Sequence, residues 1–91
     1  MRLFARLTDP AVREAAVFDA LRTGTTTTLD VKRHLRDRGY WATQDEVSRR
    51  VRRLAEAEGW PWWKMGGFRL YGVPVPGRSD VGAAVHAALV N

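Results

Sequence analysis

The sequence predicts an α+β domain that is mostly α: three helices, a β-hairpin and one further apolar helix at the C-terminus. Between residues 11 and 54, apolar side chains recur at helical spacing in three stretches that are separated by short glycine-containing segments. After Gly59 the pattern changes to alternation in two short runs, 62–65 and 68–71, on either side of Gly66-Gly67. Ninety-one residues correspond to one domain with a small core.

The first helix is predicted over 11–22. Asp9 is expected to be its N-cap and Pro10 its first helical residue, because proline is favoured where the backbone N–H has no helical partner. Gly24 then ends the apolar pattern. The sequence therefore predicts a short helix followed by the threonine-rich connector 25–28.

The second helix is predicted over 29–39, with Thr27 and Asp30 as a weak capping box and Gly39 as the C-terminal stop. Only a short turn separates it from the third segment, 42–54. Two helices joined by a short turn that contains glycine are typical of a helix-turn-helix.

The third segment has the clearest helical signature. Thr43 and Glu46 form a T-x-x-E capping box that fixes the start of the helix. Val47, Val51 and Leu54 fall on one face, whereas the opposite arc carries arginines. One face is expected to join the core, and the other is available to a partner.

The Gly66-Gly67 turn predicts the hairpin register, in which Met65 pairs with Phe68 and Trp62 with Tyr71. We expect the face with Trp63 and Leu70 to close the core over the third helix, and the face with Lys64 and Arg69 to project as a wing. Three helices followed by such a hairpin form a winged helix-turn-helix, assigned to residues 1–74.

Residues 75–91 are predicted to be a Pro/Gly linker and an apolar helix, with Ser79 or Asp80 as its cap. A helix with so few charges is expected to pack against the domain or against a second copy of the chain. Either arrangement would enlarge a small core, and the second would give a homodimer.

Composition excludes several classes of function. The chain has no cysteine and two histidines, which excludes disulfides and thiolate zinc sites and disfavours a metal centre. No apolar run is long enough to cross a bilayer, and the N-terminus does not resemble a signal peptide. We therefore expect a cytoplasmic, nucleoid-associated protein without metal, cofactor or small-molecule effector.

An enzyme is not expected, because the carboxylates occupy helix caps and surfaces, and Gly66-Gly67 fits a hairpin turn rather than a phosphate loop.

The net charge of +5, which comes mostly from arginine, favours an anionic partner. Arginine offers a planar set of donors that matches phosphates and guanine edges, so nucleic acid is the favoured partner.

The motif Gly39-Tyr40-x-Ala42-Thr43-Gln44-x-x-Val47-Ser48-Arg49 resembles a segment of the N-terminal DNA-binding domain of bacterial arginine repressors. The similarity covers roughly residues 11–74. It implies a winged helix that inserts the helix bearing Gln44, Ser48 and Arg49 into the major groove. That family's second domain, which binds arginine and builds the hexamer, has no counterpart after Pro74, so arginine sensing is not implied.

Two groups of side chains are therefore candidates for contact with double-stranded DNA. On the recognition helix they are Gln44, Ser48, Arg49, Arg52 and Arg53, and Thr43 and Glu46 cap the same helix. On the second helix and the wing, the candidates for backbone contact are Lys32, Arg33, Lys64 and Arg69.

The function predicted is sequence-specific binding of double-stranded DNA by a small transcription regulator. Two alternatives remain open: a phage excisionase-like or architectural DNA-binding factor, and a winged helix used as a protein-interaction module.

The tryptophans also allow two interpretations. Trp63 is expected in the core, whereas Trp41, Trp60 and Trp62 either cover the core or form exposed surfaces on which unpaired bases stack.

Overall fold

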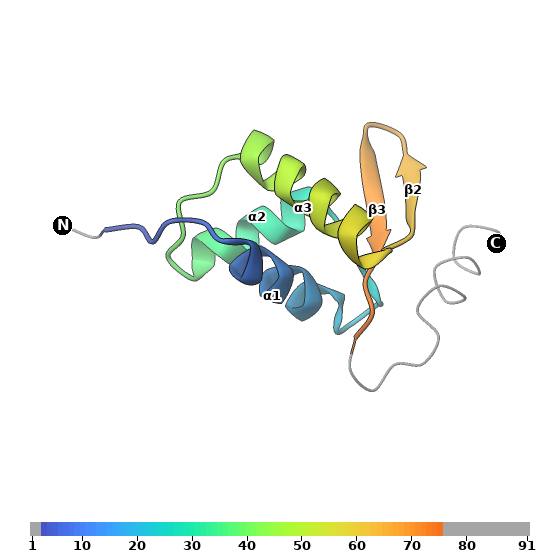
Figure 1. The fold of residues 1–91 in the computed structure, drawn as a ribbon, viewed down its shortest axis with the longest axis horizontal. Coiled ribbons are helices and arrows are strands. Elements are labelled where there is room, and N and C mark those ends of the chain that lie inside the picture. The colour runs from blue at the N-terminus through green and yellow to red at the C-terminus, as the bar shows by residue number, and fades with distance from the viewer. Residues whose placement is uncertain (1–2, 76–91) are drawn as a thin grey trace.

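Three helices precede a small antiparallel sheet in the computed structural model, which describes residues 3–75 (Figure 1). In chain order the elements are α1 (Asp9–Ala20), β1 (Thr25–Thr26), α2 (Thr28–Asp37), α3 (Gln44–Glu58), β2 (Trp62–Met65) and β3 (Phe68–Gly72). The arrangement is winged-helix-like, as predicted. The predicted C-terminal helix, and with it the predicted homodimer contact, lies outside the described residues.

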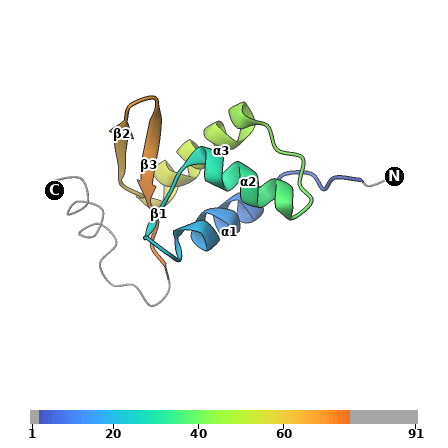
Figure 2. The same ribbon diagram turned by 180° about the vertical axis from the view of Figure 1, so that it is seen from behind.

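The core forms where the inner faces of the three helices meet (Figures 1 and 2). Val12 of α1, Val31 and Leu35 of α2, and Val47 and Val51 of α3 are all fully buried. Alanines fill most of the remaining core positions of α1, which allows the helices to approach closely. The apolar face predicted for the third helix is therefore confirmed.

Within residues 3–75, two of the three predicted N-caps are confirmed. The hydroxyls of Thr27 and Thr43 accept hydrogen bonds from backbone N–H groups three residues on. The N-cap of α1, however, is Thr8 rather than the predicted Asp9: its backbone is extended, and its hydroxyl accepts from Ala11 N. Asp9 is instead the first residue of α1, so the prediction was one residue too late.

The carboxylates of Asp9 and Glu46 are used in ion pairs. Asp9 Oδ1 accepts from Arg50 Nη1 at 2.7 Å and from Arg53 Nη2 at 3.1 Å, which ties the start of α1 to α3. Glu46 Oε1 accepts from Arg50 Nε at 3.2 Å. The predicted capping box is therefore only half present, because the Glu46 side chain pairs along the helix instead of returning to the Thr43 backbone.

The sheet contains one strand that the sequence pattern did not predict. Thr25 and Thr26, expected to be part of a connector, form β1 and pair antiparallel with Gly72 and Tyr71 of β3. The strand order is β1-β3-β2, so β3 is central. Because β1 directly precedes α2, this pairing attaches the hairpin to the helices.

The register of the hairpin is confirmed at all four pairs: Trp62 with Tyr71, Trp63 with Leu70, Lys64 with Arg69, and Met65 with Phe68. The assignment of its faces is wrong. Tyr71 is 1% exposed and belongs to the core, whereas Trp63 and Leu70 are only half-buried on the other face. The face that carries Lys64 and Arg69 is thus the one that turns toward α3.

Trp63 covers the sheet from the outer side. A Cβ atom placed on Gly72 would lie 3.4 Å from Trp63 Cζ3 and 3.1 Å from Pro61 Cγ, so both side chains pack over this glycine. Trp60, by contrast, is 5% exposed and joins the core. Of the four tryptophans, Trp41 and Trp62 are the exposed ones.

We expect Asp9→Asn to lower the free energy of unfolding by at most about 1 kcal/mol, because its ion pairs with Arg50 and Arg53 are half exposed and screened by solvent. The hydrogen bond from Arg50 holds the pKa of Asp9 below its ordinary value. Because folding lowers the pKa of Asp9, its ionised carboxylate stabilises the fold at pH values above the unfolded-state pKa of about 3.9. This stabilisation is lost as the pH falls through the folded-state pKa.

Urea unfolding between pH about 7 and about 2.5 checks this expectation. The difference between the parent and Asp9→Asn should be largest near neutral pH and should shrink as the pH falls through the folded-state pKa of Asp9. Asp45→Asn is a matched control, since Asp45 also lies in the first turn of a helix but forms no ion pair with any other residue of the described range 3–75. A gap that persisted unchanged at low pH would contradict the assigned ion pairs.

Tyr71→Ala should cost about 3–5 kcal/mol, because it removes a large side chain from the junction of sheet and helices. Tyr71→Phe keeps the ring and should stay within about 1.5 kcal/mol of the parent. Thermal or denaturant unfolding measures both. Equal stability of Tyr71→Ala and Tyr71→Phe would show that the ring does not hold the hairpin.

Candidate nucleic-acid interface

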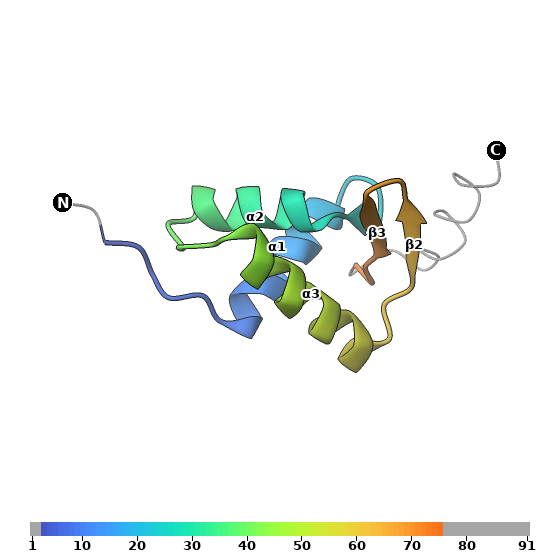
Figure 3. The ribbon, with the colours of Figure 1, turned by 90° about the horizontal axis from the view of Figure 1, so that it is seen from above.

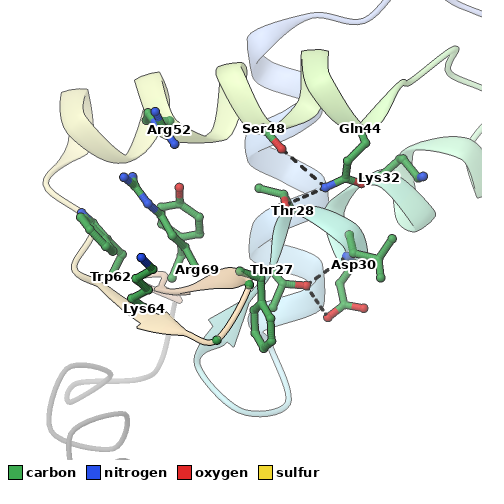
Figure 4. A pocket seen from close by; sticks show the side chains of 15 residues that line it. Thr27, Thr28, Asp30, Lys32, Gln44, Ser48, Arg52, Trp62, Lys64 and Arg69 are labelled. Atoms are coloured by element: carbon green, nitrogen blue, oxygen red, sulfur yellow. Dashed lines mark hydrogen bonds between the residues drawn. The ribbon is translucent and has the colours of Figure 1, made fainter.

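A groove of about 1300 Å³ lies between the start of α2, one face of α3 and the hairpin (Figure 4). Four cationic side chains line it: Lys32, Arg52, Lys64 and Arg69. The one carboxylate in its lining is that of Asp30. The groove is therefore a cationic surface built from three segments that are far apart in the sequence.

α3 contributes Gln44, Ser48 and Arg52, which follow one another at intervals of four residues and so share one side of the helix. Gln44 Nε2 donates to Thr28 Oγ1 at 2.9 Å and to Ser48 Oγ at 3.5 Å (Figure 4). These two bonds engage both amide hydrogens of Gln44, so its amide oxygen remains to accept from a ligand. Thr28, the first residue of α2, thus positions a side chain of α3.

The hairpin contributes Trp62, Lys64 and Arg69, which Figure 4 shows standing on the side that faces α3. The Arg69 guanidinium lies over the Trp62 ring, 3.7 Å from its centroid. This cation–π contact holds a planar donor group against an aromatic face. Trp62 nevertheless remains 46% exposed.

The Asp30 carboxylate is engaged by the groups around it. Thr27 Oγ1 donates to Asp30 Oδ2 at 3.0 Å, and Arg33 Nη1 lies 3.8 Å from Asp30 Oδ1. The negative charge is thereby partly balanced by Arg33. The potential of the groove is set by its four cations.

Carboxylates pair with arginines mainly on the other sides of the molecule. Asp9 pairs with Arg50 and Arg53, Glu58 with Arg13 at 2.8 Å, and Glu14 with Arg38 at 3.4 Å. Lys32, Arg49, Arg52 and Lys64, in contrast, form no ion pair with any residue between 3 and 75. The cations of the groove are therefore not neutralised by carboxylates within the described residues.

The groove brings together six of the nine residues predicted to contact DNA: Gln44, Ser48, Arg52, Lys32, Lys64 and Arg69. Arg49 is exposed on the adjoining strip of α3, outside the groove lining. Arg33 also lies outside the lining, beside Asp30. Arg53 is directed to the α1 side, where it is bonded to Asp9. Of the nine predicted residues, six therefore line the groove, Arg49 and Arg33 lie outside its lining, and Arg53 faces α1.

Several groove residues were not predicted as site residues. Thr28 positions Gln44, and Leu29 and Phe68 add exposed apolar surface to the groove. The position of Thr28 at the start of a predicted helix was visible in the sequence, but its bond to a residue 16 positions later was not. Phe68 directly follows the Gly-Gly turn, which identifies it as a residue of the hairpin tip.

The described part of the chain, residues 3–75, has no cluster of three or more histidine or acidic side chains able to hold a metal ion. Within the same range, no helix has the length and apolar character to traverse a membrane. Comparisons of the chain with models of protein families, with characterised proteins and with solved structures gave no match.

Proposed function

We propose that the protein is a winged-helix protein that binds double-stranded DNA in a sequence-dependent manner and acts as a transcription regulator. The observation that carries the proposal is the cationic groove between α2, α3 and the hairpin, with the exposed face of α3 at its edge. A duplex is a regular polyanion whose major groove admits an α-helix. A helix flanked by two further cationic elements matches that shape.

α3 supplies the side chains suited to base edges. Gln44 and Arg52 are eight residues apart, which corresponds to about 12 Å along the helix or three to four base pairs. Arg49 and Arg52 can each donate two hydrogen bonds to a guanine. The free amide oxygen of Gln44 suits an exocyclic amine of adenine or cytosine, and the Ser48 hydroxyl can donate to a phosphate.

The two flanking elements supply contacts to the DNA backbone. Lys64 and Arg69 project from the hairpin toward the part of α3 that carries Arg52, and Lys32 projects from α2 near Gln44 at the start of α3 (Figure 4). Such contacts fix the orientation of a protein on the duplex without selecting a base. Measuring the bend of bound DNA separates a regulator, with little bending, from an architectural factor of the same fold.

Arg49→Ala and Arg52→Ala should each weaken binding to a selected duplex site by about 1–3 kcal/mol and reduce its preference over unrelated duplexes. Neither side chain has an ion pair within residues 3–75, so the fold should keep its stability. Selection from random duplexes followed by fluorescence anisotropy gives both quantities. Arg53→Ala is the matched control, since it removes the same charge from the same helix on the side that faces Asp9.

If Arg49→Ala and Arg52→Ala bind the selected site as Arg53→Ala does, α3 is not the element that contacts bases. If the parent protein binds no duplex at low salt, the proposed function is wrong, and a protein-interaction role becomes the better interpretation. Circular dichroism of each variant establishes that the helices are retained.

Lys64→Ala should weaken binding to all duplexes by a similar factor, because a backbone contact carries no base information. The slope of log affinity against log salt concentration should fall by about 0.9, which corresponds to one neutralised phosphate. Titrations across a salt series measure this slope for selected and unrelated duplexes. An unchanged slope would mean that the hairpin does not contact the DNA backbone.

A further inference from the structure

A second, smaller depression adjoins the groove. It has a volume of about 250 Å³ and lies between the base of the hairpin and the C-terminal half of α3. Its walls include the rings of Trp60, Trp62 and Tyr71 together with Glu56. This volume corresponds to about eight water molecules, which is more than one nucleobase occupies.

The depression shares four lining residues with the groove. Arg52, Trp62, Arg69 and Tyr71 line both hollows, so the stacked pair of Trp62 and Arg69 stands at their boundary. Figure 3 shows the hairpin at the C-terminal end of α3, beyond the helix turns that carry Gln44 and Ser48. A nucleic-acid strand that leaves the groove toward this end of α3 therefore meets Trp62.

The depression offers several contacts to a base, because its lining combines aromatic residues with Arg52, Arg69 and Glu56. An aromatic ring offers a stacking surface to any nucleobase, and an arginine held over that ring adds a cationic plane. The Glu56 carboxylate offsets part of the charge of Arg52 and Arg69 in the same lining, and it can accept a hydrogen bond from the amine of a base. The Trp62 side chain is 46% exposed beside this hollow, so part of its surface is accessible to a ligand.

We propose that the depression binds an unpaired base, stacked on the Trp62–Arg69 pair, where a single-stranded extension leaves the duplex held by the groove. This inference rests on the proposed function, since the duplex positions the extension. It assigns to the protein a preference for junctions between double-stranded and single-stranded DNA. Duplex ends, gaps and locally opened sites are the substrates of this class.

The test measures the affinity of the whole 91-residue chain for three ligands by fluorescence anisotropy. The first is a blunt mixed-sequence duplex, the second is the same duplex with a three-nucleotide extension, and the third carries an abasic extension with the same phosphates. Extensions at the 5′ and at the 3′ end are both measured. The parent should bind at least one extended duplex about fivefold or more tighter than the blunt one, and the abasic extension should give much less of this gain.

Trp62→Ala should abolish the gain from the bases, measured as the ratio between the same variant's affinities for the extended and the blunt duplex, so that a change in groove contacts through Arg69 affects both affinities alike. Trp62→Phe, which keeps an aromatic ring, should retain part of the gain and excludes misfolding as the cause of the loss. Trp41→Ala is the matched control: Trp41 is also exposed, lies near a different arginine, Arg36, and is not part of the depression. It should keep the full gain.

Equal gains from natural and abasic extensions would overturn the inference, because the extension would then act through its phosphates alone. Retention of the full gain by Trp62→Ala would overturn it as well. Tight binding of the blunt duplex with no gain from any extension would leave the proposed function standing and remove only the junction preference. Failure to bind the blunt and the extended duplexes would remove both.

Discussion

The burial of Tyr71 is the constraint on which the geometry of the site depends. This ring sits where β3 meets the helices, and its neighbour across the sheet, Thr26, is buried with it. Side chains alternate along a strand, so a buried Tyr71 places Arg69 on the same face, together with their partners Trp62 and Lys64 on β2. One core contact therefore turns the polar and aromatic face of the hairpin toward α3.

This constraint also explains what the sequence could and could not predict. Helix positions, the caps at Thr27 and Thr43 and the hairpin register depend on residues close together in the chain, and the sequence predicted them. The choice between the two hairpin faces depends on β1, a two-residue strand far from the hairpin in sequence. Alternation favoured the face with Trp63 and Leu70, because the opposite face carries Lys64 and Arg69, and this local pattern selected the wrong face.

The candidate site shows the same division between local and distant information. Helical periodicity was sufficient to place Gln44, Ser48 and Arg52 on one side of α3. The role of Arg53 was decided by Asp9, 44 positions earlier, and the orientation of Gln44 by Thr28 on another helix. Ion pairs and side-chain hydrogen bonds between segments leave no periodic pattern, so the sequence alone did not reveal which arginines were already engaged.

The pairing of charges differs between the groove and other parts of the described residues. Carboxylates partner Arg13, Arg38, Arg50 and Arg53 away from the groove, whereas Lys32, Arg52 and Lys64 line it without ion pairs among residues 3–75. Near a polyanion, such a distribution produces a torque as well as an attraction. If the protein binds DNA as proposed, attraction to the groove would favour encounters in which α3 and the hairpin face the duplex. Added salt would then slow association through loss of alignment as well as loss of attraction.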